Sequence, residues 1–232
     1  AGEPLGHEET TNMEVTMVTT ELDAYLSRET SKVNYPLKVV PIVKTGNLEE
    51  EIEKMIKEEP SCLIVASSEP DGTVFESKGE IYDLIKDSKA MCILVPPGKE
   101  FSEYKRILHP VDFDSKELEK YSDLRFFFEA LDPLVVAVAV ATEKDYLELE
   151  LKSNFWTKIA KDTFLPARIR ANVLKGEEFT ETLINYSNRN EPDLIMLFQR
   201  KKNAFQKNFK TELVGTIIDK TNIPVLYFYR NG

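Results

Sequence analysis

One carboxylate lies where an α/β protein would bind a ligand. Asp112 falls within the apolar segment Arg106–Phe113, which has the composition of a buried strand. Open α/β sheets bind ligands at the carboxyl ends of their strands, so Asp112 is a candidate binding residue. An equally acceptable role for Asp112 is to cap a helix that begins near Asp114.

A basic loop provides the second candidate feature. Residues 200–210 contain five basic side chains and no acidic one, with Lys201 near the start. Such a loop can attract phosphate through its side chains. The alternative is a solvated basic loop, or one that pairs with acidic surface elsewhere in the molecule.

The sequence provides no catalytic constellation. It contains no Gly-x-Ser-x-Gly elbow, no Walker loop and no His-Glu-x-x-His motif. His109 precedes a proline in an apolar segment, which favours a structural role over that of a general base. We therefore expect that the protein is not an enzyme.

The histidines and cysteines do not form a metal-binding pattern. His7 and His109 are far apart, and Cys62 and Cys92 each lie in an apolar segment. Buried, inert thiols are the expected state of both cysteines. Two such cysteines are typical of a cytoplasmic protein, and we expect no bound metal.

Aromatic residues are expected mainly in the core. Phe155 and Trp156 share a helical segment with Ile159, so core packing is predicted for both rings. The three consecutive phenylalanines 126–128 cannot all face one side of a helix. One of these rings is therefore expected to be exposed or to lie at an interface.

Length and charge limit the possible classes of protein. The chain has 232 residues, enough for one large or two compact domains, and its 42% hydrophobic content excludes global disorder. No apolar stretch approaches the roughly 20 residues of a membrane span. The net charge is -10, and the excess lies in residues 1–100, which have 20 acidic and 10 basic side chains. This acidity argues against a nucleic-acid partner, and no membrane partner is expected.

The chain contains an internal repeat. Residues 38–67 and 168–198 both have an apolar strand, a Lys-Gly or Lys-x-Gly step, an amphipathic helix, Glu-Pro and a second apolar strand. A repeat of this length indicates two copies of one domain. We predict an N-terminal domain over residues 1–98, a linker over 99–104 and a C-terminal domain over 105–232.

Strands alternate with helices in both copies. In the first copy the predicted helices are Glu21–Val33, Asn47–Glu59 and Gly79–Asp87, with Asn47 as N-cap and Glu50 completing a capping box. In the second copy the predicted helices are Asp114–Leu131 and, approximately, residues 143–164, 178–189 and 213–221. The strands show no polar alternation, which predicts burial on both faces of a parallel sheet. The predicted strands are Met13–Thr20, Leu37–Val43, Cys62–Ser67, Met91–Val95, Arg106–Phe113, Leu134–Ala141, Arg168–Leu174, Leu194–Phe198 and Val225–Tyr229.

These elements predict an α/β protein with two tandem, doubly wound parallel-sheet domains. Only about 12 residues precede the first predicted strand, so the first domain is predicted to lack its opening strand and helix. Either the chain is a fragment, or this domain is naturally abbreviated.

The second copy resembles the universal stress proteins. The segment Ile-Leu-His-Pro-Val-Asp-Phe (107–113) is similar to the opening strand of that family, and residues 213–230 are similar to its closing segment. The resemblance implies strand order 3-2-1-4-5 and pairing through the last strands, as an intrachain pseudo-dimer or a homodimer. It also implies a cytoplasmic protein of the stress response, with protein partners that the sequence does not identify.

The resemblance also bears on nucleotide binding. The ATP-binding members carry Gly-x-x-Gly, nine residues and then Gly-Ser or Gly-Thr; here Gly215-Thr216 matches the final pair, but Phe198 and Lys201 replace the two glycines. Asp112 matches the family position that contacts adenosine. We therefore predict a non-catalytic binding or scaffolding module that is not a tight ATP binder and has no cofactor. The alternative is a sensor that binds ATP, another adenine nucleotide or a phosphate ligand through Asp112, Gly215, Thr216 and Lys201.

Overall fold

The structure is a computed structural model of the chain. It describes residues 7–32, 38–59, 62–69, 77, 80–81, 91–114, 118, 124–163, 168–199 and 211–229. The chain forms two compact units, Ala1–Met55 and Ile56–Gly232. Each unit is described by itself below.

Among the described residues of the first unit, neither of the two predicted strands is present. Helix α1 (His7–Thr30) includes the whole predicted strand Met13–Thr20, and Lys38–Val43 of the second predicted strand has no strand structure. The threonines in α1 are accommodated because Thr19 Oγ1 donates to the Val15 carbonyl at 2.7 Å, one helical turn back. A short β-branched segment therefore does not distinguish a strand from a helix when no described strand pairs with it.

The predicted N-cap of the next helix is confirmed. Helix α2 (Leu48–Glu58) begins directly after Asn47, whose Oδ1 accepts a hydrogen bond from the Glu50 backbone N–H at 3.1 Å. Three glutamates, 49–51, occupy the first turn, where negative charge complements the helix dipole. The division between the two units falls inside α2.

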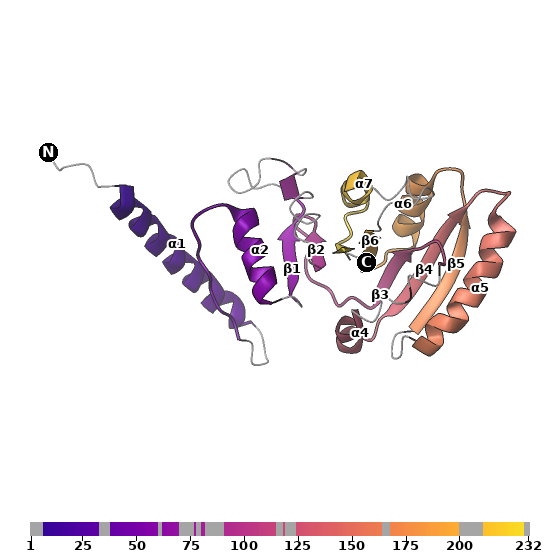
Figure 1. The fold of residues 1–232 in the computed structure, drawn as a ribbon, viewed down its shortest axis with the longest axis horizontal. Coiled ribbons are helices and arrows are strands. Elements are labelled where there is room, and N and C mark those ends of the chain that lie inside the picture. The colour runs from indigo at the N-terminus through magenta and orange to yellow at the C-terminus, as the bar shows by residue number, and fades with distance from the viewer. Residues whose placement is uncertain are drawn as a thin grey trace. The chain divides into compact units, whose positions relative to one another are not determined.

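The second unit is built on a seven-stranded sheet, drawn in Figure 1 from magenta to yellow. The strand order is β1-β2-β7-β6-β3-β4-β5, and every pair is parallel except β2–β7. The strands are β1 (Leu63–Ser67), β2 (Met91–Val95), β3 (Arg106–Pro110), β4 (Leu134–Ala141), β5 (Arg168–Lys175), β6 (Leu194–Gln199) and β7 (Val225–Tyr229).

The two halves of the sequence share this sheet. Strand β2 pairs antiparallel with β7, in a register that joins Met91 to Phe228 and Leu94 to Val225. This is the pairing of last strands that the family resemblance implied for an intrachain pseudo-dimer. The predicted linker, residues 99–104, lies between β2 and β3 within the second unit.

The α/β class is confirmed, and in residues 106–229 the strands lie in the order β5-β4-β3-β6-β7. The helices of this part are α4 (Arg125–Leu131), α5 (Tyr146–Thr163), α6 (Phe179–Asn190) and α7 (Thr211–Thr221). The predicted helix Asp114–Leu131 is therefore helical at its end, whereas Asp114 itself is not. Only Glu80 and Ile81 of the predicted helix Gly79–Asp87 are described, and both are helical.

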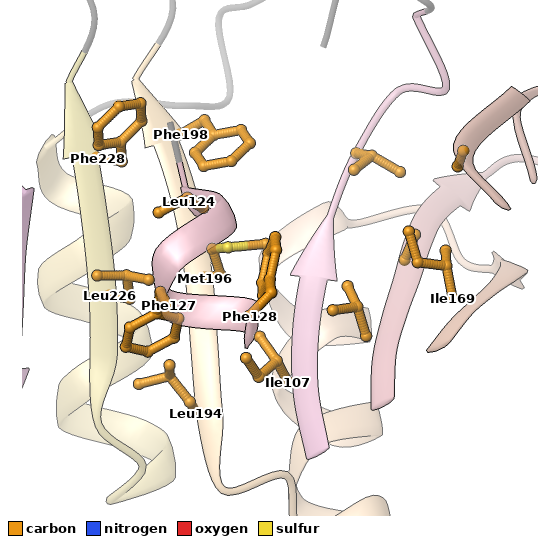
Figure 2. Close-up of a cluster of buried hydrophobic side chains, with 14 of the residues drawn as sticks. Ile107, Leu124, Phe127, Phe128, Ile169, Leu194, Met196, Phe198, Leu226 and Phe228 are labelled. Carbon is orange, nitrogen blue, oxygen red and sulfur yellow. The ribbon is translucent and has the colours of Figure 1, made fainter. Parts of the chain in front are cut away.

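The sheet is covered on both faces, as the apolar strands predicted. Ile107 and Leu108 are consecutive in β3 and fully buried, yet they belong to different core clusters. The first cluster includes Phe127 and Phe128 of α4 and Trp156 of α5, and Figure 2 shows the α4 rings packed against β6 and β7. The second includes side chains of α6 and α7. Among the described helices of residues 106–229, α4 and α5 therefore pack on one face of the sheet and α6 and α7 on the other.

The aromatic residues of α4 and α5 follow the predictions in part. Phe126 is exposed while its two neighbours are buried, as expected for three consecutive rings on one helix. Trp156 is buried, but the prediction for Phe155 was wrong, because its ring is 66% exposed on the outer side of α5. Neighbouring residues lie about 100° apart around a helix, and in α5 Trp156 faces the sheet while Phe155 faces away from it. No helix among the described residues has the length and apolarity needed to cross a membrane.

Candidate functional site

The candidate site lies where β3 and β6 separate. Strand β3 pairs with β4 along all five of its residues but with β6 only at Ile107 and Leu108. The chain continues from β3 to its neighbour β4 and then to β5, whereas β6, the neighbour of β3 on its other side, is reached from β5 through α6, so the strand order reverses at β3. In doubly wound sheets this switch point, at the carboxyl ends of the strands, is the usual ligand-binding crevice.

Two buried side chains, those of His109 and Phe198, lie at the point where β3 and β6 separate. His109 is completely buried, and its Nδ1 lies 2.8 Å from the Met196 carbonyl oxygen of β6. Since a carbonyl can only accept, Nδ1 carries the proton and donates this hydrogen bond. At His109 the two strands no longer pair through their backbones, and this side-chain hydrogen bond joins them instead. This agrees with the predicted structural role of His109.

Aromatic rings complete this packing. Phe198, which is 4% exposed, lies edge-on to His109 with ring centroids 4.6 Å apart. On its other side the Phe198 ring lies 5.7 Å from that of Phe228, and Figure 2 shows these two rings next to each other on β6 and β7. Phe198 is the residue that the family resemblance places at the first phosphate-binding glycine, and in the structure its ring is packed and buried.

The turn after β3 presents Asp112 to solvent. Its backbone is held by the Val111 N–H, which donates to the Val138 carbonyl of β4 at 2.8 Å. Phe113 adopts a positive φ of 58° and buries its ring against Trp156, with centroids 5.6 Å apart. Asp112 is exposed, and its Oδ1 accepts a hydrogen bond from the Asp114 N–H at 2.9 Å. This is the geometry of an Asx turn, while residues 115–117, where the helix that Asp112 was considered to cap would begin, lie outside the described residues.

Lys152 of helix α5 interacts electrostatically with the acidic residues of this turn. The pKa of Lys152 is raised, chiefly by its hydrogen bond with the Glu148 carboxylate and to a smaller extent by the charges of Asp112 and Asp114. The Lys152–Glu148 distance is 2.6 Å. The surface beside Asp112 therefore contains acidic and basic groups together.

The Gly-Thr pair lies inside a helix. Helix α7 begins at Thr211, two residues before the predicted start, so Gly215 is its fifth residue. Only the first four N–H groups of a helix lack an intrahelical acceptor, so the Gly215 N–H is used within α7. Gly215 is buried, Thr216 is half-buried, and Lys201 lies outside the described residues.

Sequence reasoning missed part of this arrangement. It placed Asp112 and Phe198 at the carboxyl ends of β3 and β6, but it did not identify the αL turn at Phe113 or the bond from His109 to Met196. The one available signal was the His-Pro step at the end of an apolar strand. The turn at Phe113 has no such signal, because a bulky residue rarely adopts positive φ.

The cysteines and the possible metal ligands do not form a second site among the described residues. Both cysteines are free, and burial raises the pKa of the Cys92 thiol to about 12, so that it stays protonated and inert. Among the described residues, no three His, Cys, Asp or Glu side chains cluster as metal ligands would.

The fold and the switch point together define a doubly wound α/β protein. No protein-family model matches the sequence, and no curated protein matches it. Among solved structures, a universal stress protein from Archaeoglobus fulgidus DSM 4304 is 13% identical, with a TM-score of 0.61, over 100% of this chain and 82% of that one. A functionally unknown protein from Pseudomonas aeruginosa PAO1 is 11% identical, with a TM-score of 0.58, over 98% of this chain and 79% of that one. The chain therefore has the fold of a universal stress protein.

Proposed function

We propose that this protein is a non-catalytic binding or scaffolding module of the cytoplasmic stress response, and that it does not bind ATP tightly. The observation that carries the proposal is the packing at the switch point, where Phe198 and His109 are buried between β3 and β6. Nucleotide phosphates are held by backbone N–H groups that glycines leave open, and a buried ring does not leave such an opening.

The position of Gly215 supports the same proposal independently. In an ATP site the Gly-Thr backbone would donate to phosphate from the start of a helix. Here α7 starts four residues before Gly215, so the Gly215 N–H donates a hydrogen bond within the helix. We propose that no cofactor occupies this site.

The groups available for chemistry also favour binding over catalysis. His109 is buried and donates through Nδ1 to a backbone carbonyl, and Asp112 accepts a backbone hydrogen bond from its own turn. Neither arrangement places a base beside a nucleophile. The protein would act through the partners that it binds.

Thermal-shift titration with ATP and Mg²⁺ tests the proposal. A ligand at 100 times its Kd stabilises a protein by about 2.7 kcal/mol, which raises Tm by roughly 5–11 °C for a chain of this size. We expect no saturable rise in Tm. A saturable rise that is absent in Gly215→Glu would refute the proposal, and Asp112→Asn is a second variant that leaves the core intact because Asp112 is exposed.

The alternative is a nucleotide or phosphate sensor, and the exposure of Asp112 favours it. The Asp112 carboxylate is open to solvent at the carboxyl end of β3, where adenosine would approach in a related fold. Thr216 and Lys201 would then contribute to phosphate binding. The same titration decides between the two functions, because only the sensor predicts saturation.

A further inference from the structure

An apolar stripe runs along the outer face of α5. Leu147, Leu151 and Phe155 are spaced four residues apart and are 72%, 73% and 66% exposed. On the opposite side of the helix, Trp156 is buried against the sheet, and Figure 1 shows α5 lying along β4 and β5. Residues four apart lie on one face of a helix, so the three large side chains are contiguous.

The stripe is too large to be a chance feature of a solvated helix. Three such side chains together expose on the order of a few hundred Å² of apolar surface, the size at which a patch marks an interaction site. Single exposed apolar residues are ordinary, whereas three in register along two turns form a ridge that another helix can pack against.

The charges beside the stripe indicate what that other helix is. Glu148 and Lys152 lie on the same flank of the stripe, one helical turn apart. If a second α5 packs antiparallel about a two-fold axis, this flank of one helix meets the same flank of the other, so opposite charges can pair across the interface. In a parallel arrangement, this flank would meet the opposite flank, which contains Glu150, so that Glu148 of one copy would approach Glu150 of the other.

The register makes this complementarity specific. A two-fold axis at Leu151 places Leu151 against its own copy and Leu147 against Phe155 of the other copy. On one flank, Glu148 then faces Lys152 of the other copy. The intrahelical pair Lys152–Glu148, 2.6 Å apart, would extend into a network of two acidic and two basic groups.

We propose that α5 is a self-association surface through which two copies of this chain form an antiparallel, two-fold symmetric dimer. The dimer buries Leu147, Leu151 and Phe155 and pairs Glu148 of each copy with Lys152 of the other. This interface is separate from the β2–β7 pairing, which is satisfied within one chain.

Sedimentation velocity of the full chain over a range of concentrations tests the dimer. We expect a reversible monomer–dimer equilibrium whose Kd rises at least tenfold in Leu151→Glu, which puts two carboxylates on the two-fold axis. Leu151→Met is the matched control and should keep the wild-type Kd. Because residue 151 is exposed, circular dichroism should be the same for all three proteins, and Tm should be the same at concentrations low enough for all three to be monomeric. A chain that remains monomeric throughout, or a dimer that Leu151→Glu leaves intact, overturns the proposal.

A charge swap tests the antiparallel orientation. Lys152→Glu alone makes all four groups on the flank acidic and should weaken the dimer, more strongly at low salt than at high salt. The double variant Glu148→Lys with Lys152→Glu restores opposite charges across an antiparallel interface and should return Kd to near the wild-type value. Failure of the double variant to recover the dimer overturns the proposed orientation.

Discussion

At the scale of single residues, His109 connects two strands that no longer pair through their backbones. Its Nδ1 donates to the buried Met196 carbonyl, and its ring packs on Phe198. The histidine therefore stabilises the switch point in a closed state. A side chain of similar size without a donor would fill the space but would leave a buried carbonyl without this hydrogen bond.

We predict that His109→Leu lowers the free energy of unfolding by about 1–3 kcal/mol, the cost of removing the donor from a buried hydrogen bond. Urea denaturation monitored by circular dichroism measures this difference. An unchanged midpoint and slope would show that the bond to Met196 contributes nothing.

The wild-type protein provides an independent check of the same bond. Nitrogen-15 NMR of the imidazole should show the hydrogen on Nδ1, because the Met196 carbonyl can only accept. A ring protonated on Nε2 alone would contradict the geometry.

At the scale of elements, helix ends control how the chain enters its strands. Helix α6 ends at Asn190, and its C-cap residue Glu191 has a left-handed backbone with φ 44° and donates its N–H to the Ser187 carbonyl at 2.8 Å. Two residues later, Asp193 Oδ2 accepts the backbone N–H groups of Lys105 and Arg106, at 3.0 and 2.7 Å. The start of β3 is therefore anchored by the segment that leads into β6.

Replacing Glu191 by glycine should relieve the left-handed strain. We predict that Glu191→Gly is more stable than Glu191→Ala by about 1 kcal/mol, because alanine retains a Cβ in the αL region and glycine does not. Both variants remove the same carboxylate, so the difference in stability between them measures the cost of holding a residue with a Cβ in the left-handed conformation. Thermal unfolding measures the difference, and equal Tm values would contradict it.

The sequence predicted an element best where a helix cap or a long apolar segment marked it. Asn47 correctly placed the start of α2, and five apolar segments correctly placed the strands of residues 106–229. It failed for Met13–Thr20, where β-branched residues occur in a helix. The site was partly predictable, because Asp112 and Phe198 follow from strand ends. The positive φ at Phe113 and the start of α7 at Thr211 depend on tertiary packing that one-dimensional patterns do not contain.

At the scale of the whole second unit, one sheet joins the two halves of the sequence. Strand β2 is apolar along its length and pairs with β1 on one side and β7 on the other, so it is a central strand. Strand β1 is an edge. Since the Ser68 N–H donates to the Val95 carbonyl, and N–H directions alternate along a strand, the Val65 N–H points away from β2.

A pair of proline variants tests this arrangement. Ile93→Pro removes a ladder bond from the central strand β2 and should destabilise the protein by about 3 kcal/mol or more. Val65→Pro, at an edge N–H that faces away from β2, should be tolerated with a much smaller loss. Urea denaturation gives the free energy of unfolding of both variants. Equal losses of stability would contradict the assignment of β2 as the strand that joins the two halves of the sequence.

The central claim is that the switch point between β3 and β6 is closed to nucleotide by its own side chains. Isothermal titration calorimetry of ATP with Mg²⁺ into the full-length chain tests this claim most directly, because it measures binding without relying on unfolding. The packing of Phe198 and His109 predicts no saturable heat. Saturable binding of one nucleotide per chain, lost in Asp112→Asn, would contradict it.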